Sequence, residues 1–177
     1  MMFPVHHDSL ELGDRPMRWF ILSGLVALTL LVGLDSSAFA AITGTGDVSP
    51  SDPNTWTLST DALIGDTSSG TVTADGGSLL LSRHPTIGNA SGGSGQVSIS
   101  GTGTTWNNSG YLDVGYSGSG HLTIASGGSV SNVNGYIGHY GGSDGTVMVD
   151  GAGSHVSALP DVLEPAKASV GSVVAAE

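Results

Sequence analysis

The chain has 177 residues, of which 29 are glycine, only 11% are charged and none is cysteine. Four basic residues against 15 acidic ones give a formal net charge of −11, which argues against a nucleic-acid-binding protein because the phosphate backbone would stay unneutralised. The lack of cysteine excludes a disulfide framework, a thiol nucleophile and a cysteine-ligated zinc site, and the 38% apolar content argues against a disordered chain.

Residues 1–40 have the features of a secretory signal peptide. The uncharged stretch from Trp19 to Leu34 follows two arginines, and an Ala-Phe-Ala cleavage site ends at Ala40. Met17 is an alternative start that would give a conventional short basic region. At about 1.5 Å per residue the apolar stretch spans roughly 24 Å, short of the ~30 Å hydrocarbon core of a bilayer. We therefore expect cleavage, export and no stable membrane span in the mature chain.

Residues 41–55 read AITGTGDVSPSDPNT and are rich in Gly, Ser, Asp and Pro. This composition predicts an extended polar lead-in. The lead-in either covers the first coil of the repeat region or is loose.

Residues 56–159 contain a repeat. Four segments of alternating apolar residues begin at glycines spaced 25 residues apart, namely Gly70, Gly95, Gly120 and Gly145. An aliphatic residue followed by glycine precedes each segment: Ile64-Gly65, Ile87-Gly88, Val114-Gly115 and Ile137-Gly138. Self-similarity at a fixed period is the signature of a repeat architecture.

The pattern inside each repeat predicts short strands. Apolar residues alternate with polar ones, as in Val97 and Ile99 or Leu122 and Ile124, which indicates strands with one buried face. Glycine-rich corners separate three such stretches per repeat. We therefore predict an all-β fold, a right-handed parallel β-solenoid (β-helix) of about four 25-residue coils stacked about 4.8 Å apart. The alternative is an antiparallel sandwich or barrel, which an equal period does not favour.

Residues 160–177 lose the glycine pattern. Pro160 and Pro165 cannot supply donors to a strand ladder, so we expect an irregular tail that is disordered or weakly helical, with a short helix near residues 164–169. An uncapped last coil would expose unpaired strand edges, which predicts self-association through that end of the solenoid.

Candidate chemistry is sparse. His84, His121, His139 and His155 show no metal-ligand spacing, and the aspartates mostly stand beside glycine, where they are interpreted as turn formers. Asp113 could face a groove, but the sequence offers it no evident partner. We expect no catalytic residue, metal or cofactor.

The tyrosines repeat with the coils. Tyr111 and Tyr136 are 25 residues apart, so they are expected to stack on neighbouring coils, and Tyr116 and Tyr140 lie 24 apart on the following loops. The favoured interpretation is an aromatic ladder that stabilises the solenoid. The alternative is a strip for sugar rings in which Tyr116 and Tyr140 contact a glycan.

The run from Trp106 to Gly115, the run from Gly120 to Val130 and the Tyr-Ile-Gly triplet at Tyr136 resemble the type V secretion/PEP-CTERM-associated repeat of bacterial exported proteins. The resemblance covers roughly residues 56–156. It implies an autotransporter-passenger-like β-helix that is extracellular, at the cell surface or associated with the outer membrane. It implies no catalytic residues.

Three functions are compatible with these features and are stated as expectations. The first is a structural or adhesive role at the bacterial cell surface without catalysis, with extracellular polysaccharide or a second copy of the chain as partner. The second is a polysaccharide-binding module. The third is a fragment of a β-helix polysaccharide lyase or hydrolase, which would need a basic or metal-assisted cluster. Only Arg83 and Lys167 remain basic after removal of the leader, which disfavours the enzyme.

Overall fold

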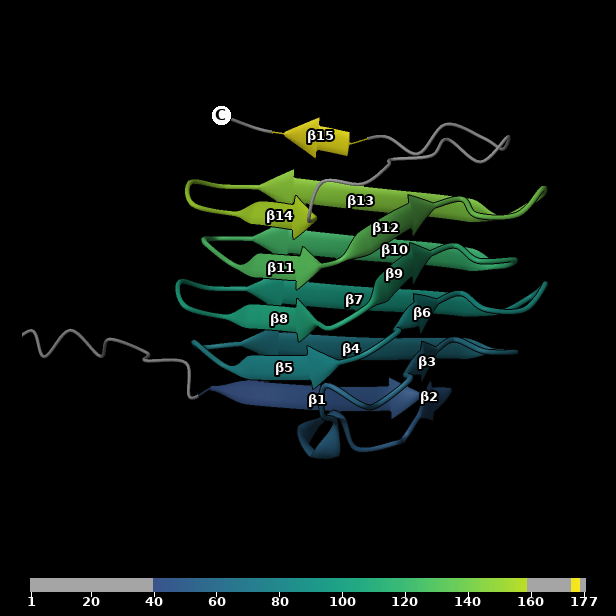
Figure 1. The fold of residues 1–177 in the computed structure, drawn as a ribbon, viewed down its shortest axis with the longest axis horizontal. Helices are drawn as coiled ribbons and strands as arrows, with labels where there is room; N and C mark the ends of the chain where they lie inside the picture. The colour runs from purple at the N-terminus through teal and green to yellow at the C-terminus, as the bar shows by residue number, and fades with distance from the viewer. Residues whose placement is uncertain (1–39, 159–172, 176–177) are drawn as a thin grey trace, which may run out of the picture. The chain divides into compact units, whose positions relative to one another are not determined.

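Each 25-residue repeat forms one coil of three short strands in the computed structural model of the protein, which describes residues 40–158 and 173–175 (Figure 1). Four such coils are stacked, which confirms the predicted all-β solenoid. The strands of the coils, in chain order, are β3 (Leu63–Ile64), β4 (Ser69–Asp75) and β5 (Leu79–Ser82); β6 (Thr86–Ile87), β7 (Ser94–Ser100) and β8 (Thr105–Asn108); β9 (Tyr111–Val114), β10 (Ser119–Ala125) and β11 (Ser129–Asn132); and β12 (Asn134–Ile137), β13 (Asp144–Asp150) and β14 (His155–Ala158).

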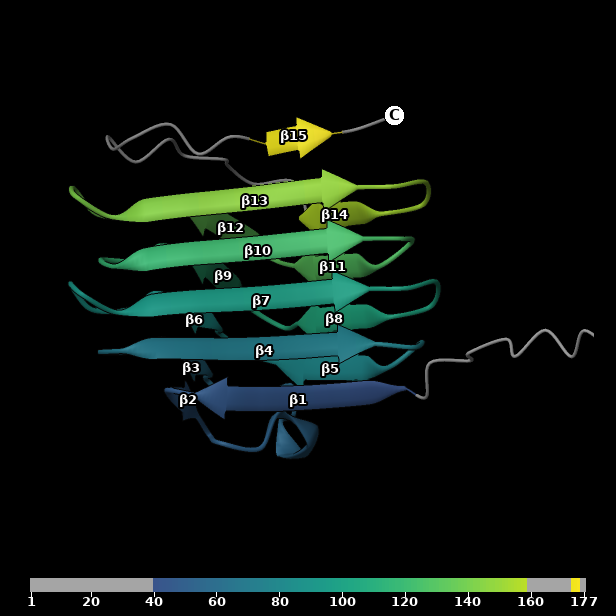
Figure 2. The same ribbon diagram turned by 180° about the vertical axis from the view of Figure 1, so that it is seen from behind.

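Corresponding strands of successive coils pair in parallel and form three sheets (Figure 2). The long sheet contains β4, β7, β10 and β13, a second contains β5, β8, β11 and β14, and a third contains β3, β6, β9 and β12. The register aligns the four repeat glycines, Gly70, Gly95, Gly120 and Gly145. The period read from the sequence is therefore the rung-to-rung step of the long sheet.

The coil is right-handed. In Figure 1 the strands of the near side, such as β8 and β11, run from left to right, and those of the far side, such as β7 and β10, run from right to left as the chain rises. This is the hand expected for crossovers between parallel strands that twist to the right.

Columns of apolar side chains fill the interior. The alternation in each strand puts one set inside, for example Val97 and Ile99 of β7 and Leu122 and Ile124 of β10, all of them buried. Leu80, Trp106 and Val130 form the matching column in the second sheet. Trp106 is fully buried, and its indole Nε1 donates to Ser82 Oγ at 2.9 Å. Coil stacking therefore removes from water an apolar face that one coil could not bury alone.

Glycine is required for two different reasons at the corner between the third sheet and the long sheet: a positive φ at one position and a close backbone approach at another. Gly65, Gly88, Gly115 and Gly138 all have φ between +67° and +74°, a region that other residues adopt at a cost. Gly95 has no such φ, but a methyl group on it would lie 2.6 Å from Ile87 Cγ2 and 2.7 Å from Gly88 N. The aliphatic-glycine pairs thus turn the chain, whereas the segment-starting glycines allow a close approach.

The lead-in covers the first coil, which is one of the two alternatives that the sequence left open. Strand β1 (Ala41–Gly46) pairs antiparallel with β4, and β2 (Val48–Ser49) pairs antiparallel with β3. A single 3-10 turn, η1 (Pro53–Thr55), comes next and leads into Trp56, which is buried and donates from Nε1 to Pro50 O at 2.9 Å. The first coil is therefore capped by antiparallel strands and an indole.

At the other end, β15 (Val173–Ala175) pairs in parallel with Val147–Val149 of β13. This part of the tail forms a strand rather than the disordered or weakly helical segment that the sequence predicted. The helix expected near residues 164–169 and the signal peptide of residues 1–40, Ala40 apart, lie outside the described residues. Among the described residues, no helix has the length and apolar character required to cross a membrane.

Candidate functional site

Six aromatic and imidazole rings gather on the outer face of the third sheet and on the turns beside it. Tyr111 projects from β9, whose alternate residues Leu112 and Val114 are buried, and Tyr136 lies on β12 beside Ile137, which packs against the core. Gly115 and Gly138, which follow these strands, have positive φ and turn the chain at the corner before Tyr116 and His139. The set, which we call the ring strip, comprises His84, Tyr111, Tyr116, Tyr136, His139 and Tyr140.

The rings form a continuous series across three coils. His84 stacks on Tyr111 with centroids 4.9 Å apart, and Tyr111 lies 6.0 Å from Tyr136 at an interplanar angle of 53°. Tyr136 stacks on His139 at 4.5 Å, and His139 stacks on Tyr140 at 4.6 Å with the planes only 7° apart. Contacts of this kind stabilise a fold by roughly 0.5–1.5 kcal/mol per pair. Tyr111 and Tyr136 lie on neighbouring coils, as expected, but their rings are tilted rather than stacked and the strand register aligns Tyr136 with Asp113.

Tyr116 lies beside this series rather than within it. Its ring is 5.0 Å from His139 and 4.7 Å from Tyr140, and nearly perpendicular to both. Its hydroxyl donates to the Tyr140 hydroxyl at 3.3 Å, and this hydrogen bond is the main cause that raises the pKa of Tyr116. Tyr116 and Tyr140, which follow equivalent glycines of successive coils by one and two residues, are therefore in direct contact.

Asp113 has a partner that the sequence did not suggest. Its Oδ1 lies 2.6 Å from Nδ1 of His139, and the side chains are only 13% and 27% exposed. Burial raises the pKa of the Asp113 carboxyl above its ordinary value, while the hydrogen bond and charge of His139 act in the opposite direction. The pair holds the His139 ring between Tyr136 and Tyr140, because it fixes one edge of the imidazole.

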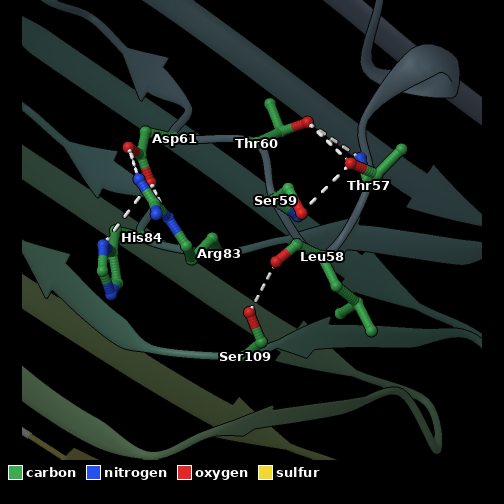
Figure 3. A network of polar contacts seen from close by, with 8 residues as sticks. All are labelled: Thr57, Leu58, Ser59, Thr60, Asp61, Arg83, His84 and Ser109. Atoms are coloured by element: carbon green, nitrogen blue, oxygen red, sulfur yellow. Dashed lines mark hydrogen bonds and ion pairs between the residues drawn. The ribbon is translucent and has the colours of Figure 1, made fainter.

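An ion-pair cluster adjoins the strip at its first ring (Figure 3). The Arg83 guanidinium donates to both carboxylate oxygens of Asp61, from Nε to Oδ1 at 2.8 Å and from Nη2 to Oδ2, and His84 Nδ1 lies 3.4 Å from Asp61. The hydrogen bond from Arg83 lowers the pKa of Asp61 and raises that of Arg83. Ser109 Oγ donates to Leu58 O at 2.7 Å, which ties the cluster's loop to the turn that follows β8.

The remaining candidates lie apart from the strip. His121 projects from β10 and His155 from β14, on the other two sheets. Asp66 accepts a hydrogen bond from Asn89 Nδ2 at 2.6 Å, a contact between equivalent turns of successive coils, in keeping with its interpretation as a turn residue. Within residues 40–158 and 173–175 no group of three or more His, Cys, Asp or Glu side chains is arranged to hold a metal ion.

Sequence reasoning therefore found the tyrosines but missed the histidines and Asp113 as members of one cluster. The contact between Asp113 and His139 joins residues 26 apart, whereas the aligned pair in the sheet, Asp113 and Tyr136, is separated by 23. A sequence signal for this contact did exist. The aliphatic-glycine pairs are not spaced by 25 residues as the glycines of the long sheet are, so the register of the third sheet is shifted relative to that of the long sheet.

Comparisons with models of known families, with curated proteins and with solved structures find no significant match.

Proposed function

We propose that this protein is an exported bacterial repeat protein with a structural or adhesive role at the cell surface, and that the ring strip is its contact surface. The observation that carries the proposal is the presentation of six rings on one side of a stacked scaffold. Each ring is held by contacts to its neighbours, so little conformational freedom would be lost when a partner binds.

Two features of the sequence support export. The leader at residues 1–40 has the order of basic, apolar and small-residue regions of a signal peptide. The resemblance to the type V secretion/PEP-CTERM-associated repeat points to the same location, on or outside the bacterial surface.

The charges near the strip support a role without catalysis. A solenoid enzyme that cleaves acidic glycans requires cations to neutralise the substrate carboxylate and to stabilise the transition state. Arg83, the chain neighbour of His84 in the strip, is bound by both oxygens of Asp61. The overall charge of −11 would also repel an acidic substrate.

Surface display and adhesion test the proposal together. The full chain, expressed in a bacterium with an outer membrane, should be exported and should be cleaved by protease added to intact cells. Beads coated with the purified protein should adhere to bacterial cells more strongly than uncoated beads. A Tyr111→Ala/Tyr140→Ala variant should reduce adhesion, whereas Met148→Ala, on the long sheet, should not. Retention in the cytoplasm, or beads no more adhesive than uncoated ones, would overturn the proposal.

A further inference from the structure

We propose that the ring strip binds a chain of neutral polysaccharide, laid along the stacking direction of the coils. This inference rests on the proposed function and names the ligand of the same surface. Sugar rings combine apolar C–H faces, which pack on aromatic rings, with hydroxyl groups that both donate and accept hydrogen bonds. The strip and its polar neighbours offer both kinds of contact.

Two tyrosines offer most of the aromatic surface. Tyr111 is 44% exposed and Tyr140 is 49% exposed, whereas the other rings of the strip are more deeply packed. The centroids of Tyr116, His139 and Tyr140 form a nearly equilateral triangle with sides of 5.0, 4.7 and 4.6 Å. Tyr116 therefore lies at the side of the stack, and the face of Tyr140 opposite His139 is covered by none of the strip's rings.

Polar groups stand at both ends and in the middle of the strip. The carboxylate of Asp61 and the guanidinium of Arg83 lie beside His84, and the hydroxyls of Tyr116 and Tyr140 meet at the far end. Between them, Nδ1 of His139 contacts Asp113, and in the tautomer that donates Nδ1–H to the carboxylate the Nε2 atom is left as an acceptor. Such a mixture of fixed donors and acceptors suits the hydroxyls of a sugar and orients the chain.

The charge of the site selects a neutral glycan. Two carboxylates, Asp61 and Asp113, border the rings, and the guanidinium of Arg83 is already paired with one of them. A uronic acid placed here would meet like charge, and the guanidinium of Arg83 is not available to it because it is paired with Asp61. A neutral glycan has no such penalty, and the ladder of stacked rings is assembled before the ligand arrives.

Affinity electrophoresis in gels that contain a soluble polysaccharide tests the inference. The probes are a β-glucan, a galactomannan and a xylan as neutral chains, with alginate and polygalacturonate as acidic ones. At least one neutral chain should retard the protein, and the acidic chains should not. Tyr140→Ala should weaken binding to the retarding polysaccharide about tenfold, because loss of one exposed aromatic ring typically changes affinity by about that factor. Tyr111→Ala/Tyr140→Ala, which removes both exposed rings, should weaken it further.

Two controls separate loss of binding from loss of fold. Met148→Ala removes a side chain that is also 44% exposed, but on the long sheet, and should leave retardation unchanged. Tyr140→Phe keeps the ring face and should retain most of the binding. Thermal unfolding of every variant must match the wild type for its result to count, and if the alanine variants unfold, the retardation of the wild type by neutral and not by acidic chains still decides the inference.

The outcomes distinguish this inference from the proposed function. Retardation by no neutral chain, a preference for the acidic chains, or full retention of binding in the folded double alanine variant would each overturn the glycan site. If the adhesion of coated beads still depends on Tyr111 and Tyr140, the proposed function survives that result. Binding to a neutral glycan by a protein that stays in the cytoplasm would instead refute the surface role and leave the glycan site in place.

Discussion

Replacement of Gly95 by alanine should destabilise the solenoid strongly, whereas the same replacement at Gly141 should stabilise it. A methyl group on Gly95 would lie 2.7 Å from Gly88 N and 2.6 Å from Ile87 Cγ2, and would also press on Ile64 O. Ordinary contact begins at 3.4 Å, so the backbone of Gly88 would have to move by 0.7 Å (3.4 − 2.7). Ile64 and Ile87 are fully buried, and the adjoining rungs leave no room for that movement.

The expected loss for Gly95→Ala is about 3 kcal/mol, the upper part of the usual range for overpacking a packed core. At Gly141 nothing lies within 4 Å of the added methyl group, and its φ is not in the left-handed region. There the restriction of the unfolded chain should dominate and stabilise the protein by about 0.4–1 kcal/mol. The pair of variants therefore differs in sign as well as in size.

Urea denaturation monitored by circular dichroism measures both effects. The midpoint should fall for Gly95→Ala and rise for Gly141→Ala while the denaturant slope stays constant, which indicates a change of stability rather than of mechanism. Equal stability of the Gly95→Ala variant and the wild type, within about 0.5 kcal/mol, would refute the close approach of neighbouring strands at this glycine.

Further variants test the buried Trp106, the contact between Asp113 and His139, and the turn at Asp47 between β1 and β2. Trp106→Ala should cost about 3–5 kcal/mol in the same assay, because the indole is fully buried, and a loss below 1 kcal/mol would be incompatible with its place in the core. Burial raises the pKa of Asp113 above 3.8, so its contribution to stability is present below that pH and is lost as the pH rises through the raised value. The stability of Asp113→Asn relative to wild type should therefore increase with pH from about 3 to 7, and a flat or falling difference would show that burial of the carboxyl is not the dominant effect. Hydrogen bonds from the backbone N–H groups of Thr67 and Ser68 lower the pKa of Asp47, so the contribution of Asp47 to stability is present above pH 3.8 and is lost as the pH falls through the lowered pKa. Asp47→Ala should therefore make the urea midpoint less sensitive to acid. An unchanged pH profile would contradict these hydrogen bonds.

The fold could be predicted from the sequence because the interactions that determine it are local and periodic. Each coil repeats the same alternation and the same corner glycines, so the 25-residue step was visible in Gly70, Gly95, Gly120 and Gly145 before any pairing was known. The antiparallel cap was not predictable, because β1 contains Gly44 and Gly46 and occurs only once, without a second copy to reveal its period. Strand β15 was missed for the same reason.

The candidate site was only half predictable. Tyrosines at the same place in successive coils must lie near each other, and Tyr116 and Tyr140 do. His139 carried no such signal, because its partner Asp113 belongs to the strand of the preceding coil, whereas His139 belongs to a turn. A contact between a strand and a turn depends on the number of residues that form each corner of the coil. Because the corner loops differ in length, the sequence spacing does not show which turn residue lies beside which strand residue.

The assembly of the ring strip by the coil register is the claim on which the functional account depends, and nuclear Overhauser effects between assigned ring protons test it most directly. Cross-peaks are expected between His84 and Tyr111 and between Tyr116 and Tyr140, which are pairs from different coils with centroids 4.9 and 4.7 Å apart. Well-resolved ring signals that lack both cross-peaks, with His84 or Tyr116 in contact with other residues instead, would contradict the register and with it the strip.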